Sequence, residues 1–258
     1  MGLTLAGISP FSSAAVYSGA AAACVEPLAF VSVQSGGVNL TDVVTTLTLS
    51  NVVIAASTCP LRLQLALIAR ENVYVGPSTA IQDVTRGGVS MTFGFSFGST
   101  TPISCGPPSF CARMEMWYIL NPLVGTEDIV VTTLGVDAAG AGIIASAWQF
   151  NGVNQIAPFG AEVAAGSQTE QHSLNVPSNI GELVVAWIHG RHNHDLTEPG
   201  GGQTNRYTEL HHGPASTDRH AESKGATLAG ASTVNVRWDN AGNNQDESIT
   251  VGLSLRPA

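Results

Sequence analysis

Lysine is almost absent from this sequence: Lys224 is the only one, beside nine arginines. Charged residues make up 11% of the chain, against about 25% in an average soluble domain. The formal net charge is −9. Because a protein must present a basic surface to neutralise phosphates, this balance excludes nucleic acid as a partner.

Long apolar runs and helical periodicity are also missing. No window of about 18 residues is free of polar interruption, so we expect no insertion into a membrane. No basic residue precedes Arg62, which argues against a secretory signal. Residues 1–23 are rich in Ala, Ser and Gly, and we expect an extended arm over residues 1–27. The alternative is a cleaved signal with a mature terminus near Cys24.

Four cysteines are too few for a disulfide framework in a chain of this length. Cys105 and Cys111 flank a Gly-Pro-Pro turn, so a small disulfide between them is one expectation, with unpaired thiols as the other. A zinc site is excluded there, because two further ligands at regular spacing are absent. We expect Cys24 and Cys59 to be buried thiols that act as small apolar residues.

Alternation of apolar and polar residues dominates from about Phe30 onward. In residues 61–67 every second residue is Leu, which is typical of a strand with one buried face. Residues 89–97 place Val89, Met91, Phe93, Phe95 and Phe97 on one face. Further strands are predicted at residues 28–34, 42–50, 113–120, 128–134, 142–150, 170–176, 182–189, 233–238 and 248–255.

Many short strands separated by turn signals indicate an all-β fold. We predict a single large antiparallel β-sandwich, jelly-roll-like, over residues 28–258, because no linker and no internal repeat is visible. Its surface carries Thr, Ser, Asn and Gln where sheet edges usually carry Lys and Glu. Such a surface suits a protein outside the cell or one covered by neighbours in an assembly.

Six of the seven histidines lie between residues 189 and 220: His189, His192, His194, His211, His212 and His220. Together with Asp195, those of residues 189–195 have the donor types that a transition metal prefers. Their spacing matches no metalloprotease motif. Residues 190–225 are polar, so we predict a long, solvated, His-rich loop or hairpin and assign no metal. A bound metal and a pH-sensitive contact surface remain as alternatives.

Glycoside hydrolysis needs two acidic residues facing each other across a cleft. Glu115, Glu182 and Asp195 are the candidates, but a strand Glu beside Arg113 is more often half of a surface ion pair. No Ser lies in a G-x-S-x-G elbow, and the three glycines at residues 200–202 lack the Lys of a phosphate-binding loop. We therefore assign no catalytic or cofactor-binding residue.

Trp117, Trp148, Trp187 and Trp238 all fall within predicted strands and have apolar neighbours. We expect them to pack in the core, because a sandwich interior accommodates bulky aromatic side chains. Exposure of one or two of them for stacking on a sugar is the alternative.

Several phrases form a recognisable pattern: residues 113–122 (RMEMWYILNP), followed by Gly125-Thr126; residues 146–155 (SAWQFNGVNQ); and a last strand at residues 251–257 (VGLSLRP). The pattern resembles jelly-roll-like β-sandwich domains of bacteriophage structural proteins and bacterial surface proteins, over residues 30–258. It consists of turn and core residues, so it implies a fold and carries no catalytic residue. The Ala-rich arm and the His-rich segment depart from it.

The leading functional hypothesis is a non-enzymatic virion structural protein, either a capsid decoration (cement) protein or a tail-associated component. Its partners would be copies of itself and other virion proteins, reached through the arm and the sheet edges. No cofactor is expected. The alternative is a carbohydrate-binding or host-adhesion module on a cell surface that contacts a host-surface glycan. A secreted polysaccharide hydrolase is the third hypothesis.

Overall fold

A computed structural model describes residues 24–40, 46–72, 81–97, 111–133, 141–167, 171–192, 196–197, 202–212, 220–240 and 248–258. The predicted all-β antiparallel sandwich is confirmed. No helix among the described residues is long and apolar enough to cross a membrane. In chain order the strands are β1 Ala29–Leu40, β2 Thr46–Ile54, β3 Leu63–Asn72, β4 Ile81–Arg86, β5 Val89–Ser90, β6 Thr92–Phe97, β7 Cys111–Leu120, β8 Gly125–Thr133, β9 Ala141–Asn151, β10 Phe159–Ser167, β11 Gln171–Pro177, β12 Leu183–His192, β13 Leu196–Thr197, β14 Thr204–His212, β15 His220–Ala229, β16 Thr233–Asn240 and β17 Ser248–Leu255.

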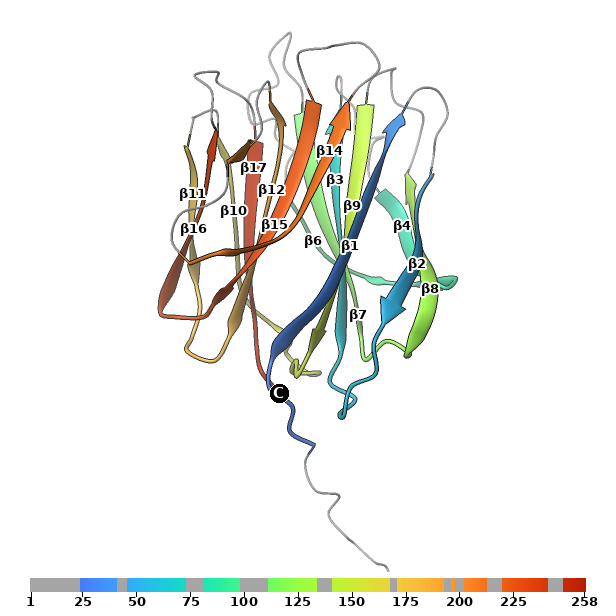
Figure 1. Cartoon of the computed structure of the whole chain (residues 1–258), viewed down its shortest axis with the longest axis vertical. Coiled ribbons are helices and arrows are strands. Elements are labelled where there is room, and N and C mark those ends of the chain that lie inside the picture. The colour runs from blue at the N-terminus through green and yellow to red at the C-terminus, as the bar shows by residue number, and fades with distance from the viewer. Residues whose placement is uncertain are drawn as a thin grey trace, which may run out of the picture.

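Four sheets are stacked in the sandwich (Figure 1). In β1–β9, the first half, an outer sheet has the order β2-β8-β4-β5 and an inner sheet the order β1-β9-β3-β7-β6. In β10–β17, the second half, the inner sheet has the order β10-β17-β12-β15-β14 and the outer sheet β11-β16-β13. The two inner sheets face each other in the middle of the stack.

Three apolar cores separate the four layers. Trp117 lies in the first-half core, between the outer and inner sheets of that half, and Trp238 lies in the corresponding second-half core. Trp148 and Trp187 lie in the central core, between the two inner sheets. All four side chains are buried, which confirms the prediction that the tryptophans pack in the core.

The two halves have the same strand order, a repeat that the sequence does not reveal. The inner sheets correspond strand by strand: the order β1-β9-β3-β7-β6 of the first half matches the order β10-β17-β12-β15-β14 of the second half. The outer strands β2-β8-β4 likewise correspond to β11-β16-β13. In each half the first strand lies beside the last, and the first four strands alternate between the inner and the outer sheet, as do the last three, which is jelly-roll connectivity.

Irregularities in strand pairing repeat as well. The register of β6 on β7 shifts after Phe93, and that of β14 on β15 shifts after Asn205. Phe93 lies opposite Trp117, the seventh residue of β7, and Asn205 lies opposite Ala226, the seventh residue of β15. A bulge inserts one residue at a defined point of a ladder, so the structural repeat extends to the same position of the same strand pair in each half.

Two local predictions are wrong. Residues 89–97 do not form one strand: Met91 separates β5 from β6, and the bulge after Phe93 leaves that ring 46% exposed while Phe95 packs on the central core. Residues 190–225 do not form one long His-rich loop, but the alternative prediction, a hairpin, is confirmed for β14 and β15. They contain the end of β12, β13, β14 and the start of β15, and β14 pairs with β15.

The other predicted strands are confirmed, with ends that differ by a few residues. They correspond to β1, β2, β3, β7, β8, β9, β11, β12, β16 and β17. The predicted arm falls mostly on residues 1–23, which lie outside the described part of the chain. Residues 24–28 approach β1 as an extended segment.

Candidate functional site

Glu115, the first candidate acid, is buried in an ion pair. On β7 the alternation places Arg113, Glu115 and Trp117 on the face toward the first-half core. The Arg113 Nε donates to Glu115 Oε1 at 2.6 Å, and the Trp117 Nε1 donates to Oε2 at 3.2 Å. Since the carboxylate is 3% exposed, the expected surface pair is an internal one, and Glu115 is out of reach of a polysaccharide.

Burial also acts on Arg70, which lies opposite Arg113 on β3. Loss of solvation lowers the pKa of Arg70 to about 10, although the charge of Glu115 opposes that change. The guanidinium stays charged at neutral pH. This end of the first-half core therefore holds a compact group of two arginines and one glutamate.

The second half has a matching ion pair of reversed order. The Lys224 Nζ lies 3.1 Å from Glu222 Oε1, and both side chains are buried on the second-half core face of β15. Glu222 and Lys224 are the third and fifth residues of β15, as Arg113 and Glu115 are of β7. The only lysine of the chain is thus internal. The sequence analysis named Lys224 for its rarity alone and did not consider Glu222.

Glu182, the second candidate acid, stabilises the turn between β11 and β12. Asn179 donates its backbone N–H to Oε2 and its side-chain amide to Oε1, both at 3.0 Å. Burial alone would raise the pKa of Glu182, but these hydrogen bonds, with Ser254 and Arg256, lower it below its ordinary value. Glu182 and Glu115 lie in different halves and do not face each other. Asp195, the third candidate, lies outside the described residues.

Of the three histidines in residues 189–195, the structure describes the side chain of His189 alone. His189 is buried and, by alternation with Trp187, belongs to the face of β12 toward the central core. The side chain of His192 lies outside the described part of the structure. His194 lies outside the described residues. Among the residues that the structure describes, no group of three His, Cys, Asp or Glu side chains is placed to hold a metal ion.

The aromatic side chains form a buried network in the central core. The Trp148 ring makes edge contacts with Phe30, Trp187 and Tyr207 at centroid distances of 5.8, 5.9 and 5.6 Å. Tyr207 hydrogen-bonds Ser223 at 2.9 Å, and burial raises its pKa. The expected alternative, a tryptophan exposed for sugar stacking, is wrong, since all four tryptophans are buried.

A disulfide joins Cys24 to Cys59. The expectation that these two residues are free thiols is wrong, because the extended segment before β1 runs back beside the turn between β2 and β3. Asn151 also donates to Glu26 Oε1 at 3.3 Å. Gly152 leaves room for this segment, since a Cβ there would lie 2.4 Å from the carbonyl of Pro27. Cys105 lies outside the described residues, and so does its expected pairing with Cys111.

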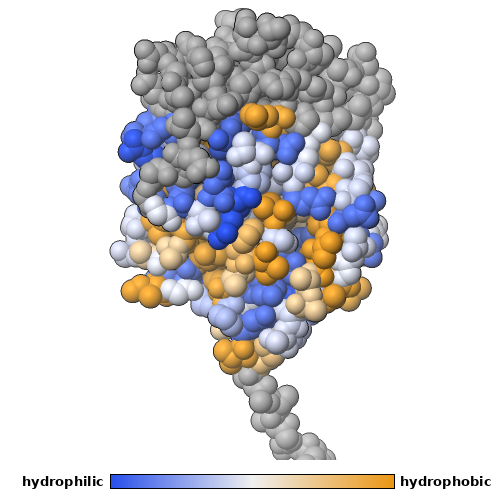
Figure 2. All heavy atoms as spheres, in the orientation of Figure 1, coloured by the Kyte–Doolittle hydropathy of each residue, from blue (hydrophilic) through white to orange (hydrophobic). Residues whose placement is uncertain are grey.

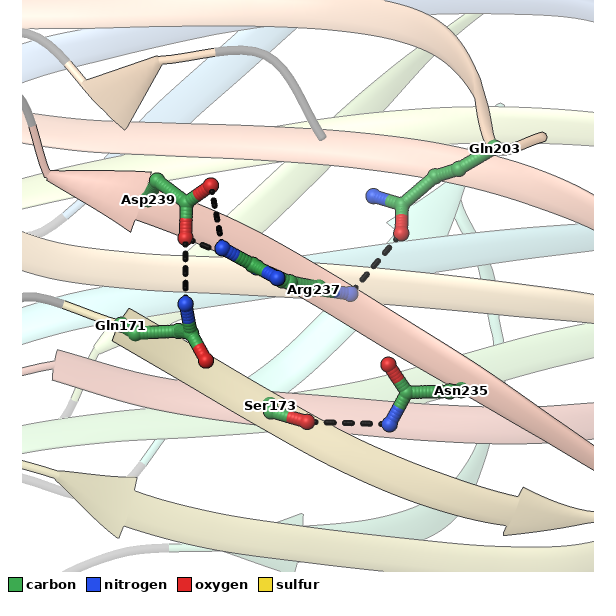
Figure 3. Close-up of polar contacts among 6 residues, drawn as sticks. All are labelled: Gln171, Ser173, Gln203, Asn235, Arg237 and Asp239. Atoms are coloured by element: carbon green, nitrogen blue, oxygen red, sulfur yellow. Dashed lines mark hydrogen bonds and ion pairs between the residues drawn. The ribbon is translucent and has the colours of Figure 1, made fainter. Parts of the chain in front are cut away.

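The outer sheets meet solvent with polar, mostly uncharged side chains. On the second outer sheet, Asn235 donates to Ser173 Oγ at 2.9 Å, and Arg237 donates to both oxygens of Asp239 at 2.9 and 3.1 Å (Figure 3). Gln171 adds a bond to Asp239 Oδ1 at 3.2 Å. The cross-strand hydrogen bonds of Asn235 and Gln171 and the ion pair within β16 allow an exposed face with few unpaired charges.

Large apolar side chains are exposed in the turns at the lower end of the molecule in Figure 1. We call this end, which carries Leu123, Ile156 and Ile180, the apolar end. Ile156 is 96% exposed, Ile180 93% and Leu123 81%. Val25 lies beside the disulfide and is also exposed. Figure 2 shows apolar surface around this end of the molecule. The sequence analysis missed these residues, although each is an isolated apolar residue next to a turn signal.

Backbone hydrogen bonds connect the turns of the apolar end. Asn121 donates to Arg62 O at 2.7 Å, Val153 to Leu61 O at 3.0 Å, and Asn154 to Arg256 O at 3.0 Å. The turns that carry Leu123 and Ile156 are therefore linked to the turn between β2 and β3, and the turn of Ile156 is also linked to Arg256 after β17. The comparisons with protein families, with curated proteins and with solved structures find no match to this chain.

Proposed function

We propose that the chain is a non-enzymatic structural protein of a virion, a capsid decoration or tail-associated component, that binds copies of itself and other virion proteins. The apolar end carries this proposal. Apolar side chains exposed by more than four-fifths, such as Ile156 and Ile180, lose contact with water when a neighbouring subunit covers them. Exposed apolar surface of this kind marks sites of protein–protein contact.

The arm begins at the same end. Residues 1–25 contain no charged side chain, and Glu26 is the first. An extended chain of 23 residues reaches about 75–80 Å, whereas the 12-residue strand β1 spans about 40 Å. The arm is long enough to cross to a neighbour and lie along its surface. An interface of about 1,000 Å² or more would then hold each contact.

The disulfide fixes where the arm starts. With Cys24 tied to Cys59, a pull on the arm acts on the folded sandwich and does not peel β1 from the inner sheet. Disulfides persist in oxidising surroundings such as virion and cell surfaces. The bond therefore fits a virion component, and it fits an extracellular protein equally.

Truncation of the arm tests the proposal. A chain lacking residues 1–22 retains Cys24 and its disulfide, so we expect it to fold with the circular dichroism and melting temperature of the full chain. Native mass spectrometry of the purified proteins, and of parent particles made with each, should show incorporation of the full chain and loss of the truncated one.

A paired substitution tests the apolar end separately. Ile156→Ser with Ile180→Ser should reduce incorporation at least tenfold. Val53→Ser, which changes an exposed apolar residue of β2, should leave it unchanged. Normal incorporation of both the truncated chain and the Ile156/Ile180 variant contradicts the proposal.

A carbohydrate-binding module is the second candidate. The polar face of the second outer sheet favours it, since amide, hydroxyl and guanidinium groups of Asn235, Ser173 and Arg237 lie together there (Figure 3). Glycan-array binding that is lost in Arg237→Ala and retained by the arm-truncated chain would favour this function over assembly.

A further inference from the structure

The two inner sheets are joined along one side, where their edge strands β1 and β14 lie side by side (Figure 1). The Arg206 guanidinium of β14 lies 4.2 Å from the centroid of the Phe30 ring of β1. Ser35 of β1 donates to Glu209 of β14 at 2.8 Å. On the other side the edge strands are β6 and β10, and β10 packs against β11. Strand β6 pairs with β7, and no described strand pairs with its free edge.

Strand β6 lacks the side chains that usually protect a sheet edge. Natural edge strands carry charged residues or proline, which stop a second chain from pairing with their unpaired N–H and C=O groups. Residues 87–97 contain no charged residue and no proline. Thr92, Gly94 and Ser96 are exposed, and the exposed surface of Gly94 is backbone. The bulge after Phe93 bends the strand but leaves the residues that follow it in regular pairing with β7.

Apolar side chains remain in contact with water along this edge. The Phe93 ring is 46% exposed, and its edge contact with Trp117, at a centroid distance of 5.3 Å, holds it in place. Val89 of the preceding strand β5 is 60% exposed. Phe95 and Phe97 pack on the central core and are half-buried. A neighbour that covered the edge would remove this surface from water, which favours association.

We propose that β6 pairs with β6 of a second copy of this chain, so that the two first inner sheets form one continuous antiparallel sheet across a dimer. This contact adds to the proposed binding of copies to one another and uses neither the arm nor the apolar end. The absence of charge in residues 87–97 favours a second copy as the partner. Each copy has a formal charge of −9, but at this edge two copies meet without repulsion.

The strand is also complementary to itself. A two-fold axis perpendicular to the sheet relates two antiparallel copies of one strand, so the pair is a closed dimer, the commonest form of oligomer. In a register centred on Ser96, Phe95 of each copy lies opposite Phe97 of the other. Both rings then belong to the same face of the continuous sheet, and aromatic pairs that face each other across antiparallel strands stabilise the pairing.

Analytical ultracentrifugation of the full, disulfide-bonded chain tests the proposal and should show a monomer–dimer equilibrium. Ser96→Lys should raise the dissociation constant at least about tenfold, because two like charges would lie opposite each other at the two-fold axis. Ser96 is exposed and lies opposite Glu115 of β7, so a lysine there is compatible with the fold. Phe93→Lys should weaken the dimer as well, and Ser96→Lys keeps the test decisive if that variant fails to fold.

Hydrogen exchange locates the contact. The amides of residues 92–97 should exchange more slowly at concentrations where the wild type is dimeric, and this dependence should be lost in Ser96→Lys. Val53→Lys is the matched control, because Val53 is an exposed apolar residue of β2, the edge strand of the first outer sheet. It should dimerise like the wild type.

The variant with Ile156→Ser and Ile180→Ser should also dimerise normally, since the apolar end is a separate surface. A monomeric wild type overturns the proposal, and so does a Ser96→Lys variant that dimerises like the wild type. Equal loss of the dimer in Val53→Lys overturns it too. Loss of the dimer in the Ile156/Ile180 variant alone would assign the contact to the apolar end, which overturns the pairing of β6 and supports the proposed function.

Discussion

At the scale of single residues, both halves hold an ion pair in their interiors at the third and fifth positions of one inner strand. Arg113–Glu115 and Glu222–Lys224 occupy equivalent places with opposite order of charge. The side chains of Glu115, Glu222 and Lys224 are buried and that of Arg113 is 17% exposed, so each pair has lost most of its hydration. The net stabilisation by such a pair is small, whereas removal of one partner leaves a buried charge without compensation.

Glu222→Gln should therefore lower the free energy of unfolding by about 3 kcal/mol, because Lys224 would remain charged and buried without its carboxylate. The double variant Glu222→Met with Lys224→Met should lose less than the single variant, since no charge is left behind. Urea denaturation of the three proteins measures the difference. A double variant that is less stable than Glu222→Gln would contradict this account.

The sequence indicated the correct face for Glu115 but not its burial. Alternation separated Arg113, Glu115 and Trp117 from Met114 and Met116, and the structure places the two sets on opposite faces of β7. Alternation cannot tell that both faces of a strand are covered, because that depends on a second sheet formed by distant parts of the chain. The same limit applies to Cys24 and Cys59, whose pairing depends on the path of the chain before β1.

At the scale of elements, the turn between β11 and β12 depends on Glu182 as an ionised acceptor. Its pKa in the folded chain is lowered, so the unfolded chain takes up a proton at higher pH than the folded chain does. The resulting stabilisation is present above the ordinary pKa of a glutamate, about 4.3, and is lost as the pH falls through the lowered value.

Glu182→Gln should accordingly flatten the dependence of stability on pH in the region below about 4.5. At neutral pH it should cost about 1–2 kcal/mol, since the amide accepts fewer hydrogen bonds from Asn179 than the carboxylate does. Melting temperatures between pH 3 and pH 7 check both points. If the melting temperatures of the variant and the wild type change with pH in parallel, ionised Glu182 does not stabilise the folded chain in this way.

Two of the strands that the sequence missed, β14 and β15, have physical reasons for an irregular pattern. In β15 the interior positions include Glu222, Lys224 and Gly225 in place of large apolar residues. Gly225 is needed where it lies, since a Cβ there would be 2.3 Å from Trp148 Cζ2 and 2.4 Å from Tyr207. Strand β14 is the edge strand of its sheet, and Thr204, Thr208 and Leu210 are exposed, so its residues are mostly polar. Both strands therefore resemble a loop in composition.

At the scale of the whole molecule, two features have opposite effects on how the halves unfold. The repeated strand order favours independent unfolding of each half, whereas the shared central core favours joint unfolding. Each half has its own interior, as an independent domain would. The central core, however, buries Leu63, Leu65, Trp148, Trp187 and Leu253 between the two inner sheets. Edge contacts add to it, since Ser35 donates to Glu209 at 2.8 Å and the Arg206 guanidinium lies 4.2 Å from the Phe30 ring centroid.

We expect the central core to make the two halves unfold together. Separation of the halves would expose one complete apolar sheet face on each half. Exposure of apolar surface to water costs about 25 cal/mol of free energy per Å². Differential scanning calorimetry of the full chain should show one transition whose calorimetric and van't Hoff enthalpies agree. Trp148→Ala should lower its midpoint, with a loss of about 3–5 kcal/mol, and should not split it. Two transitions in the wild-type chain would mean that the inner sheets separate before either half unfolds, and that the repeated units are held together only as neighbouring domains.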